Sequence, residues 1–311
     1  MWALTLLLLT LPLPGCYAVV AHYAYRPPNR QPILSHLTTP LSEYPQPEGS
    51  QPLRVELPNG VTLHADLYPP LPVTPGRRDG RAPHPPLALV LHTFAHSARQ
   101  PALRPWITAF RQAGYTVLAP DLPGHGRSSS TPPTFGPREA ESLTLLLKHI
   151  REMSPGPPQP LVLFAISYGS AAAIQLATTP DLPYTPTALI TLTPFADPNA
   201  VIASYARHAA HPLLLFTPPS WITAAARRNQ RHALGHRPKT PVQHAPQLPP
   251  DLPWLIVHGL DDRHTPPQNA GQLFNARPVN TTLELVPDRH HHSLLLSPES
   301  YLIPRVFDFI P

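Results

Sequence analysis

The sequence is poor in cysteine and in charged residues. Cys16 is the only cysteine among 311 residues, so no intramolecular disulfide can stabilise the fold. Charged residues make up 13% of the chain and hydrophobic residues 42%, whereas soluble domains carry roughly 25% charged residues. This balance excludes a chain that is disordered through charge repulsion, and the length suffices for a large core in one domain or two.

Lysine is nearly absent, so the basic residues are almost all arginine. The 23 Lys and Arg include only Lys148 and Lys239, and with 18 Asp and Glu they give a net charge of +5. The one arginine cluster, Arg227, Arg228 and Arg231, lacks the interleaved aromatic residues of surfaces that bind nucleic acid. We therefore expect a solvated helix face there and no nucleic-acid partner.

Proline is abundant, with 49 residues. Because proline removes a backbone donor and disrupts helix interiors, this number argues against an all-helical fold and suits short elements joined by many loops. Residues 53–57 and 61–68 alternate in polarity around Asn59 and Gly60, which predicts an antiparallel hairpin.

Buried strands alternating with helices are predicted after the hairpin. Such a pattern is typical of an α/β fold with a mostly parallel central sheet and flanking helices. The predicted strands cover residues 87–92, 115–120, 160–166, 187–193, 254–259 and 283–286. One predicted helix ends at Gly114, and another carries Leu143, Leu146, Leu147 and Ile150 at helical spacing. The interval before residue 254 is too long for a simple crossover, so we expect a small helical cap at about residues 195–250.

The N-terminal segment has the features of an export signal or a membrane anchor. Residues 2–13 form an apolar run with the length of a signal-peptide core, and the stretch LPGC (13–16) follows. LPGC resembles a bacterial lipoprotein cleavage box, which implies lipid attachment at Cys16 and a protein held in the cell envelope, facing the periplasm. The alternative is an uncleaved inner-membrane anchor with the folded domain in the cytoplasm.

The domain organisation follows from these compositions. Residues 1–25 are expected to form the signal peptide or membrane anchor, and residues 26–51 a Pro-rich tether. Residues 52–311 are expected to form the folded domain, with the membrane as a partner only through the N-terminal segment.

Ser167 lies where a predicted strand gives way to a helix of small residues. Ala165 precedes it by two positions and Gly169 follows it by two. A sharp turn that strains the serine backbone and exposes its Oγ at a helix N-terminus needs such small flanks, which is typical of a nucleophile elbow. Taken alone, the pattern fits a structural serine about as well.

Several stretches, in the same order along the chain, resemble the α/β-hydrolase superfamily over about residues 50–310. VLHTF (90–94) is similar to the superfamily's oxyanion strand end, AGYTVLAPDLPGHGRSSS (113–130) to its most recognisable stretch, and HGLDDRHTPP (258–267) to its acid loop. The N-terminal region resembles envelope-anchored bacterial members of the esterase and lipase type. The resemblance implies an α/β-hydrolase fold and a serine hydrolase.

The resemblance also implies the groups that would assist Ser167. The superfamily pattern of glycine, two residues and an acid selects Asp262 rather than Asp261 as the orienting carboxylate. The oxyanion would be held by the backbone N–H groups of Phe94 and Tyr168. Thr93 departs from the usual glycine at its position and is expected to lower turnover.

The superfamily's histidine lies on the loop after the last strand, about five residues beyond the strand's final apolar residue. Counting from Val286 selects His291 as the base, with His292 as the alternative. His290 and His292 are expected to point away from Ser167, because successive side chains diverge in a turn.

The expected activity is cleavage of an ester or related acyl substrate through an acyl-enzyme, as in carboxylesterases and lipases, with a small acyl ester as substrate and no cofactor. Leu213 to Phe216 and Trp221 in the expected cap suit an acyl group, or else pack the cap itself. Peptidase or thioesterase activity remains an alternative, as does a non-catalytic envelope-anchored binding protein.

Other polar residues are expected to have structural roles. His92, His125 and His258 should hydrogen bond to the backbone, and Asp121 should fix a loop. The run of histidines at 290–292 lacks the spacing of a metal site, so no metal is expected.

Overall fold

An open, mostly parallel sheet organises the chain. The structure is a computed structural model that describes residues 44–72, 84–157, 159–199, 201–202, 218–295 and 298–311. Its strands are β1 (Gln51–Glu56), β2 (Thr62–Tyr68), β3 (Leu87–Leu91), β4 (Thr116–Pro120), β5 (Pro160–Ile166), β6 (Thr185–Leu192), β7 (Trp254–Gly259) and β8 (Thr281–Val286).

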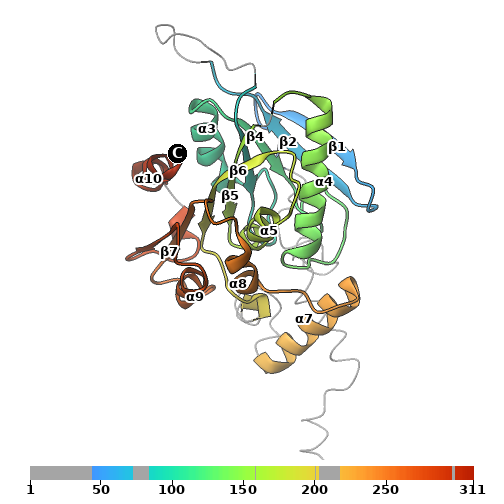
Figure 1. Cartoon of the computed structure of the whole chain (residues 1–311). Helices are drawn as coiled ribbons and strands as arrows, with labels where there is room; N and C mark the ends of the chain where they lie inside the picture. Colours follow the sequence, from blue (N-terminus) through green and yellow to red (C-terminus); the bar gives the residue numbers. More distant parts are fainter. Residues whose placement is uncertain (1–43, 73–83, 158, 200, 203–217, 296–297) are drawn as a thin grey trace, which may run out of the picture.

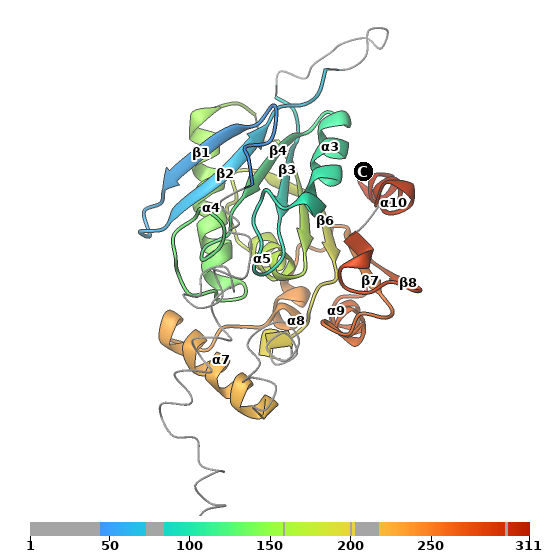
Figure 2. The ribbon, with the colours of Figure 1, turned by 180° about the vertical axis from the view of Figure 1, so that it is seen from behind.

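The strands lie in the order β1-β2-β4-β3-β5-β6-β7-β8 (Figures 1 and 2). β1 pairs with β2, and β2 with β4, in antiparallel register, while all later neighbours are parallel. The predicted hairpin is confirmed: Gly60 adopts φ +79°, and the Val61 N–H donates to Asn59 Oδ1 over 3.2 Å.

Helices cover both faces of the sheet. The described helices are α3 (Arg104–Gln112), α4 (Pro137–Met153), α5 (Tyr168–Ala177), α7 (Pro219–Leu234), α8 (Pro241–His244), α9 (Gln268–Ala276) and α10 (Leu302–Phe309). Short 3-10 helices lie at Pro101–Leu103, Ala245–Gln247, Ser293–Leu295 and Pro298–Ser300. Buried side chains of α4, α5 and α9 pack in one core cluster, and those of α3 and α10 pack in the other.

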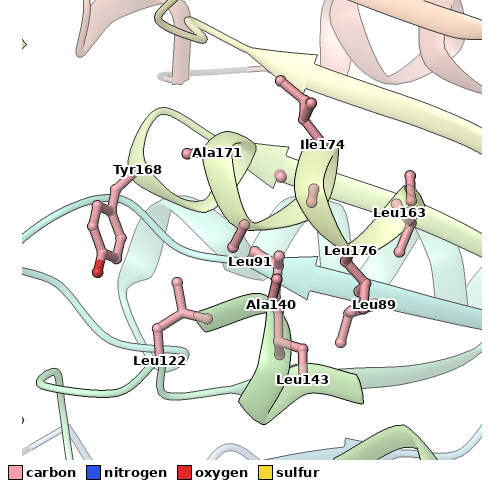
Figure 3. Close-up of a cluster of buried hydrophobic side chains, with 14 of the residues drawn as sticks. Leu89, Leu91, Leu122, Ala140, Leu143, Leu163, Tyr168, Ala171, Ile174 and Leu176 are labelled. Atoms are coloured by element: carbon pink, nitrogen blue, oxygen red, sulfur yellow. The ribbon is translucent and has the colours of Figure 1, made fainter. Parts of the chain in front are cut away.

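The core beneath the candidate serine is built from small and branched residues. Leu89, Leu91 and Leu163 of the central strands contact the helix layer that contains Ala171 and Ile174, and all five side chains are buried (Figure 3). Because α5 presents mainly small side chains to the sheet, it can lie close to β3 and β5.

The predicted helices are confirmed. Leu143, Leu146, Leu147 and Ile150 are all buried on α4. α3 ends at Gln112, and Gly114 follows at φ +89°. Glycine adopts this left-handed conformation more easily than other residues, which lets the chain turn from α3 into β4.

The predicted α/β fold is confirmed, and the interval between β6 and β7 contains α7 and α8. In both views α7 lies at one end of the molecule, outside the layers that cover the sheet (Figures 1 and 2). The limits of the expected cap stay a prediction, and its residues 213–216 lie outside the described residues. The same is true of the N-terminal segment with Cys16 and of most of the tether.

Among the helices that the structure describes, none combines the length and the apolar character needed to cross a membrane.

The close approach of α5 to β3 predicts opposite effects of alanine at two helical glycines. A Cβ on Gly169 would lie 2.7 Å from Leu91 Cβ and 2.9 Å from His92 O, whereas one on Gly271 of α9 would meet no heavy atom within 4 Å. Gly169→Ala should therefore lower the free energy of unfolding by about 1–3 kcal/mol. Gly271→Ala should raise it by about 0.5–1 kcal/mol, because alanine has less backbone entropy to lose.

Chemical denaturation of both variants checks this expectation. Equal stability of Gly169→Ala and Gly271→Ala would mean that the α5–β3 approach is not tight.

Candidate active site

Ser167 occupies a strained turn between β5 and α5. Its backbone adopts φ +49° and ψ −108°, and its N–H donates to Leu192 O on β6 over 2.8 Å. Gly169 lies against β3, with its N–H 3.2 Å from His92 O. The small flank predicted at Gly169 is thus a steric requirement, because β3 leaves no room for a side chain there.

Asp262 and His291 come from different loops and form a buried pair. Asp262 lies three residues after Gly259, which ends β7, and His291 lies five residues after Val286, which ends β8. His291 Nδ1 lies 2.7 Å from Asp262 Oδ2, and the two residues are 7% and 2% exposed. Because a carboxylate only accepts, Nδ1 carries the proton, which leaves Nε2 as the acceptor of a neutral imidazole.

The Asp262 carboxylate is held by donors on both oxygens. Oδ1 accepts the N–H groups of His264 and Thr265 over 2.9 and 2.8 Å, and His258 Nε2 lies 3.3 Å from Oδ2. Burial raises the pKa of this carboxyl, but the hydrogen bonds from His258, His291 and the Thr265 N–H, with the attraction to His291 when that imidazole is protonated, outweigh burial and hold the pKa well below its usual range. Asp262 is therefore ionised at neutral pH.

The contact between His258 and Asp262 was not predicted from the sequence. The expected backbone bond of His258 is present, because its Nε2 also lies 2.7 Å from Thr265 O. The side chain thus supports the loop that carries Asp262 as well as the carboxylate itself. Only the four-residue spacing of the two residues hinted at this contact.

The residues next to Asp262 and His291 in the sequence do not belong to this buried pair in the same way. His290 Nδ1 lies 2.9 Å from the main-chain oxygen of Asp261, so His290 holds the loop that carries Asp262. His292, expected to point away from Ser167, lines the same cavity as Ser167, with its ring centroid 5.3 Å from that of His291. Which of the two rings is directed at Ser167 stays a prediction. Hydrogen bonding to Asp262 distinguishes His291 from His292.

Ser167, His291 and His292 line one cavity of about 230 Å³. Its wall is mainly apolar, with Phe94, Phe135, Phe195, Val201 and Ile202, and the remaining lining residues are Thr93, Ala95, His96, Tyr168, His264 and Thr265. Burial, with the charges of His92 and His292, lowers the pKa of His96 to about 4, so this side chain is neutral at neutral pH. The cavity therefore suits an apolar group next to a small polar centre.

Both residues whose N–H groups were predicted to hold an oxyanion, Phe94 and Tyr168, line this cavity. Tyr168 begins α5, so its N–H belongs to the first helical turn, where the helix dipole places partial positive charge. Phe94 follows Thr93, whose Oγ1 donates to Gln100 Oε1 over 3.3 Å. Thr93 is thus accommodated by a side-chain hydrogen bond where the superfamily usually has glycine.

A buried carboxylate fixes the side chain of Tyr168. Tyr168 Oη donates to Glu139 Oε1 over 2.6 Å, and Glu139, which is fully buried, also accepts from Thr134 N, Thr134 Oγ1 and Gly136 N. The start of α4 and the start of α5 are therefore joined through one carboxylate. No sequence pattern signalled this contact, which spans 29 positions.

The polar residues predicted to be structural contact the backbone. His92 Nδ1 lies 2.7 Å from Thr93 O and its Nε2 accepts the Leu122 N–H, while His125 Nδ1 lies 3.1 Å from Pro123 O. Asp121 accepts the N–H groups of Ala98 and Arg127, and also Arg127 Nε. The predicted backbone contacts of these residues are confirmed.

Metal binding finds no support in the described residues, since no three His, Cys, Asp or Glu side chains among them are grouped to hold an ion.

The chemistry available to this arrangement is proton transfer beside a hydroxyl. A neutral imidazole with its Nδ1–H fixed on a carboxylate presents Nε2 as a base, and a hydroxyl at a strained turn is exposed to an incoming electrophile. Ser167 lines the cavity that His291 also lines.

Comparisons with known proteins agree with this architecture. In solved structures, the chain is similar to an esterase from Pyrococcus furiosus, with 17% identity, a TM-score of 0.61 and coverage of 84% of this chain and 90% of that one. It is also similar to an α/β serine hydrolase without a lid from Xanthomonas campestris, with 19% identity, a TM-score of 0.55 and coverage of 86% and 97%. Dipeptidyl peptidase 4 from Porphyromonas gingivalis matches with 19% identity and a TM-score of 0.58, over 84% of this chain and 35% of that one.

A search of curated proteins gave no match. The model of the alpha/beta hydrolase family, however, matches residues 88–302. This match spans most of the chain, and the chain therefore belongs to the alpha/beta hydrolase family.

Proposed function

We propose that the protein is a serine hydrolase that cleaves a small acyl ester through an acyl-enzyme. The observation that carries the proposal is the 2.7 Å contact between His291 Nδ1 and Asp262 Oδ2 at the cavity lined by the strained Ser167. A serine, a histidine and a buried carboxylate in these relations are the parts that nucleophilic acyl transfer needs.

In the proposed first step, Ser167 Oγ attacks the ester carbonyl carbon while His291 Nε2 takes the hydroxyl proton. The oxyanion of the tetrahedral intermediate faces the N–H groups of Phe94 and Tyr168. The intermediate collapses as His291 returns the proton to the leaving alcohol, which leaves an acyl group on Ser167. Water then repeats both transfers, releases the acid and restores the serine.

Asp262 orients the imidazole without taking its proton. The lowered pKa of Asp262 keeps the carboxylate negative, so it stabilises the imidazolium that forms when His291 accepts a proton. Positioning by His258 and the backbone donors fixes this carboxylate before substrate arrives, so little reorganisation is required in the reaction.

The lining of the cavity favours an ester over a peptide. The wall is mainly apolar, with three phenylalanines, a valine and an isoleucine among its residues, and no Asp or Glu is among the described residues that line it. A peptide with a free amino terminus would need a carboxylate to hold its ammonium group. The small volume suits a short acyl chain, as in a carboxylesterase.

Ser167→Ala should abolish hydrolysis of p-nitrophenyl esters, because the nucleophile is lost, with the free energy of unfolding changed by no more than about 1 kcal/mol. Ser170→Ala is the matched control: it removes a hydroxyl from α5, three residues after Ser167, that does not line the cavity, so this variant should retain most activity. Hydrolysis by Ser167→Ala at the wild-type rate would exclude the mechanism. Labelling of wild type by a fluorophosphonate, absent in Ser167→Ala, would separate an enzyme from a binding protein of the same fold.

Of the three consecutive histidines, only His291 should be indispensable. His291→Ala should lower kcat/KM by about three orders of magnitude or more, because it removes the base. His290→Ala and His292→Ala should lose far less, since neither has a hydrogen bond to Asp262 among the described contacts. The measurement is kcat/KM for each variant. If His292→Ala were inactive and His291→Ala active, the base would be assigned one residue too early.

We further propose that the N-terminal segment attaches the protein to the cell envelope through a lipid on Cys16. The support is the apolar run at residues 2–13 followed directly by LPGC. A single acyl chain binds a membrane only marginally, so stable attachment would use more than one chain.

Cys16→Ser should move the protein from the membrane fraction to the soluble fraction, because no other thiol is present. Growth with a fatty-acid analogue should label wild type and leave Cys16→Ser unlabelled. An unlabelled wild type that stays with the membrane would instead indicate an uncleaved anchor.

A further inference from the structure

A second cavity, separate from that of Ser167, is lined by cationic side chains. It has a volume of about 120 Å³ and lies between α7, the loop after it and residues 134–135. Arg227 and Arg231 of α7 line it together with Arg237 and Lys239 of the following loop. We refer to these four side chains as the cationic cluster.

Two hydrogen bonds between α7 and the region at the start of α4 hold the walls of this cavity together. Gln230 Nε2 donates to Thr134 O over 3.3 Å, and Arg138 Nη2 donates to Ala233 O over 3.1 Å. Gln230 is 3% exposed, so the first of these bonds is shielded from water. The cationic cluster is therefore presented by an anchored helix.

The positive charge of the cluster is not neutralised within the described structure. Among the described residues, none of its four side chains takes part in an ion pair, and no Asp or Glu lines the cavity. Lys239 Nζ donates to Oε1 of Gln247, a neutral side chain, over 3.3 Å. Asp197 directly precedes the lining residues Pro198 and Asn199; its Oδ1 accepts the backbone and side-chain N–H groups of Asn199, and no described ion pair joins it to the cluster. Four like charges around one small cavity repel one another, and an anion between them would relieve that repulsion.

The cationic cavity adjoins the one that contains Ser167. Phe135 lines both cavities, so its side chain forms a shared wall. The two cavities are therefore neighbours on either side of Phe135, and a substrate that occupied both would have to pass this side chain.

We propose that the cationic cluster binds an anionic group, a carboxylate or a phosphate, carried by the substrate that is cleaved at Ser167. This inference rests on the proposed function and narrows its substrate class to esters with an anionic end. The volume of about 120 Å³ is enough for one small anionic group such as a carboxylate or a phosphate. Arginine forks match both groups, because their paired N–H donors fit two oxygens.

The test compares the binding of matched, uncleavable ligands to the full-length Ser167→Ala protein. Methyl ketones of graded chain length replace the esters, in three sets that end in a methyl, a carboxylate or a phosphate group. Calorimetry should give the anionic ketones of suitable length about tenfold higher affinity than the methyl-ended ones. The set with the larger preference identifies the carboxylate or the phosphate as the group that is bound.

The charge variants locate the site. Arg227→Gln and Arg231→Gln, made as separate single variants, should each remove much of the preference for anionic ketones. Arg228→Gln is the matched control, because Arg228 belongs to the same helix and carries the same charge but does not line the cavity, and this variant should keep the preference. All these side chains are exposed, so the fold should be unaffected, and thermal unfolding of each variant checks this.

Equal affinity for the anionic and methyl-ended ketones would overturn the proposal. So would a loss in Arg228→Gln as large as in Arg227→Gln or Arg231→Gln, because the net positive charge of the protein would then explain the preference. Since no ligand is cleaved, failure of the cationic site is distinguishable from failure of the serine mechanism, which the ester assays with Ser167→Ala test separately.

Discussion

The backbone of Ser167 adopts a left-handed conformation that costs a residue with a side chain about 1–3 kcal/mol, so its surroundings must hold it there. β5 on one side and α5 on the other provide this constraint, with the Ser167 N–H bound to β6 and Gly169 packed against β3. The same turn sets where Oγ lies and where the first N–H groups of α5 point. One turn therefore fixes the position of the Ser167 hydroxyl and that of the Tyr168 N–H, the candidate oxyanion donor.

Electrostatics around the site separate the roles of its titratable groups. Asp262 is held ionised by donors on both oxygens, while burial keeps His96 neutral. His291 lies between these environments, hydrogen bonded to the carboxylate and facing the cavity. One neighbour, Asp262, thus fixes the orientation of the imidazole through its Nδ1.

The sequence predicted the sheet well because its signal is local. Runs such as residues 160–166 are apolar throughout, as a strand buried on both faces requires, and Asn59-Gly60 specifies its turn by backbone chemistry alone. The turn at Ser167 could also be predicted, because a glycine at position 169 indicates that no side chain fits there. By contrast, the register of His291 depended on resemblance, because nothing in HHH distinguishes the three positions physically.

The contacts that were missed join residues far apart in sequence. Glu139 binds Tyr168 across 29 positions, and the cavity that Ser167 shares with His292 depends on how two loops meet. Arg227 and Arg231 were expected on a solvated helix face, and both are exposed, but the sequence held no sign that Arg237 and Lys239 would line the same cavity. Such encounters are set by tertiary packing, which periodicity and turn signals do not encode.

The open sheet leaves β1 and β8 as its two edges, and these carry some of the chain's few charges. Arg54 and Glu56 form an ion pair on β1, and Glu284 of β8 binds Arg305 of α10 over 2.8 Å. A charged side chain on an edge strand must lose its water if another strand is to pair with that edge, which opposes aggregation between copies. Although the chain has few charges, some of them lie on the two edge strands, whose unpaired N–H and C=O groups could otherwise pair with a strand of another molecule.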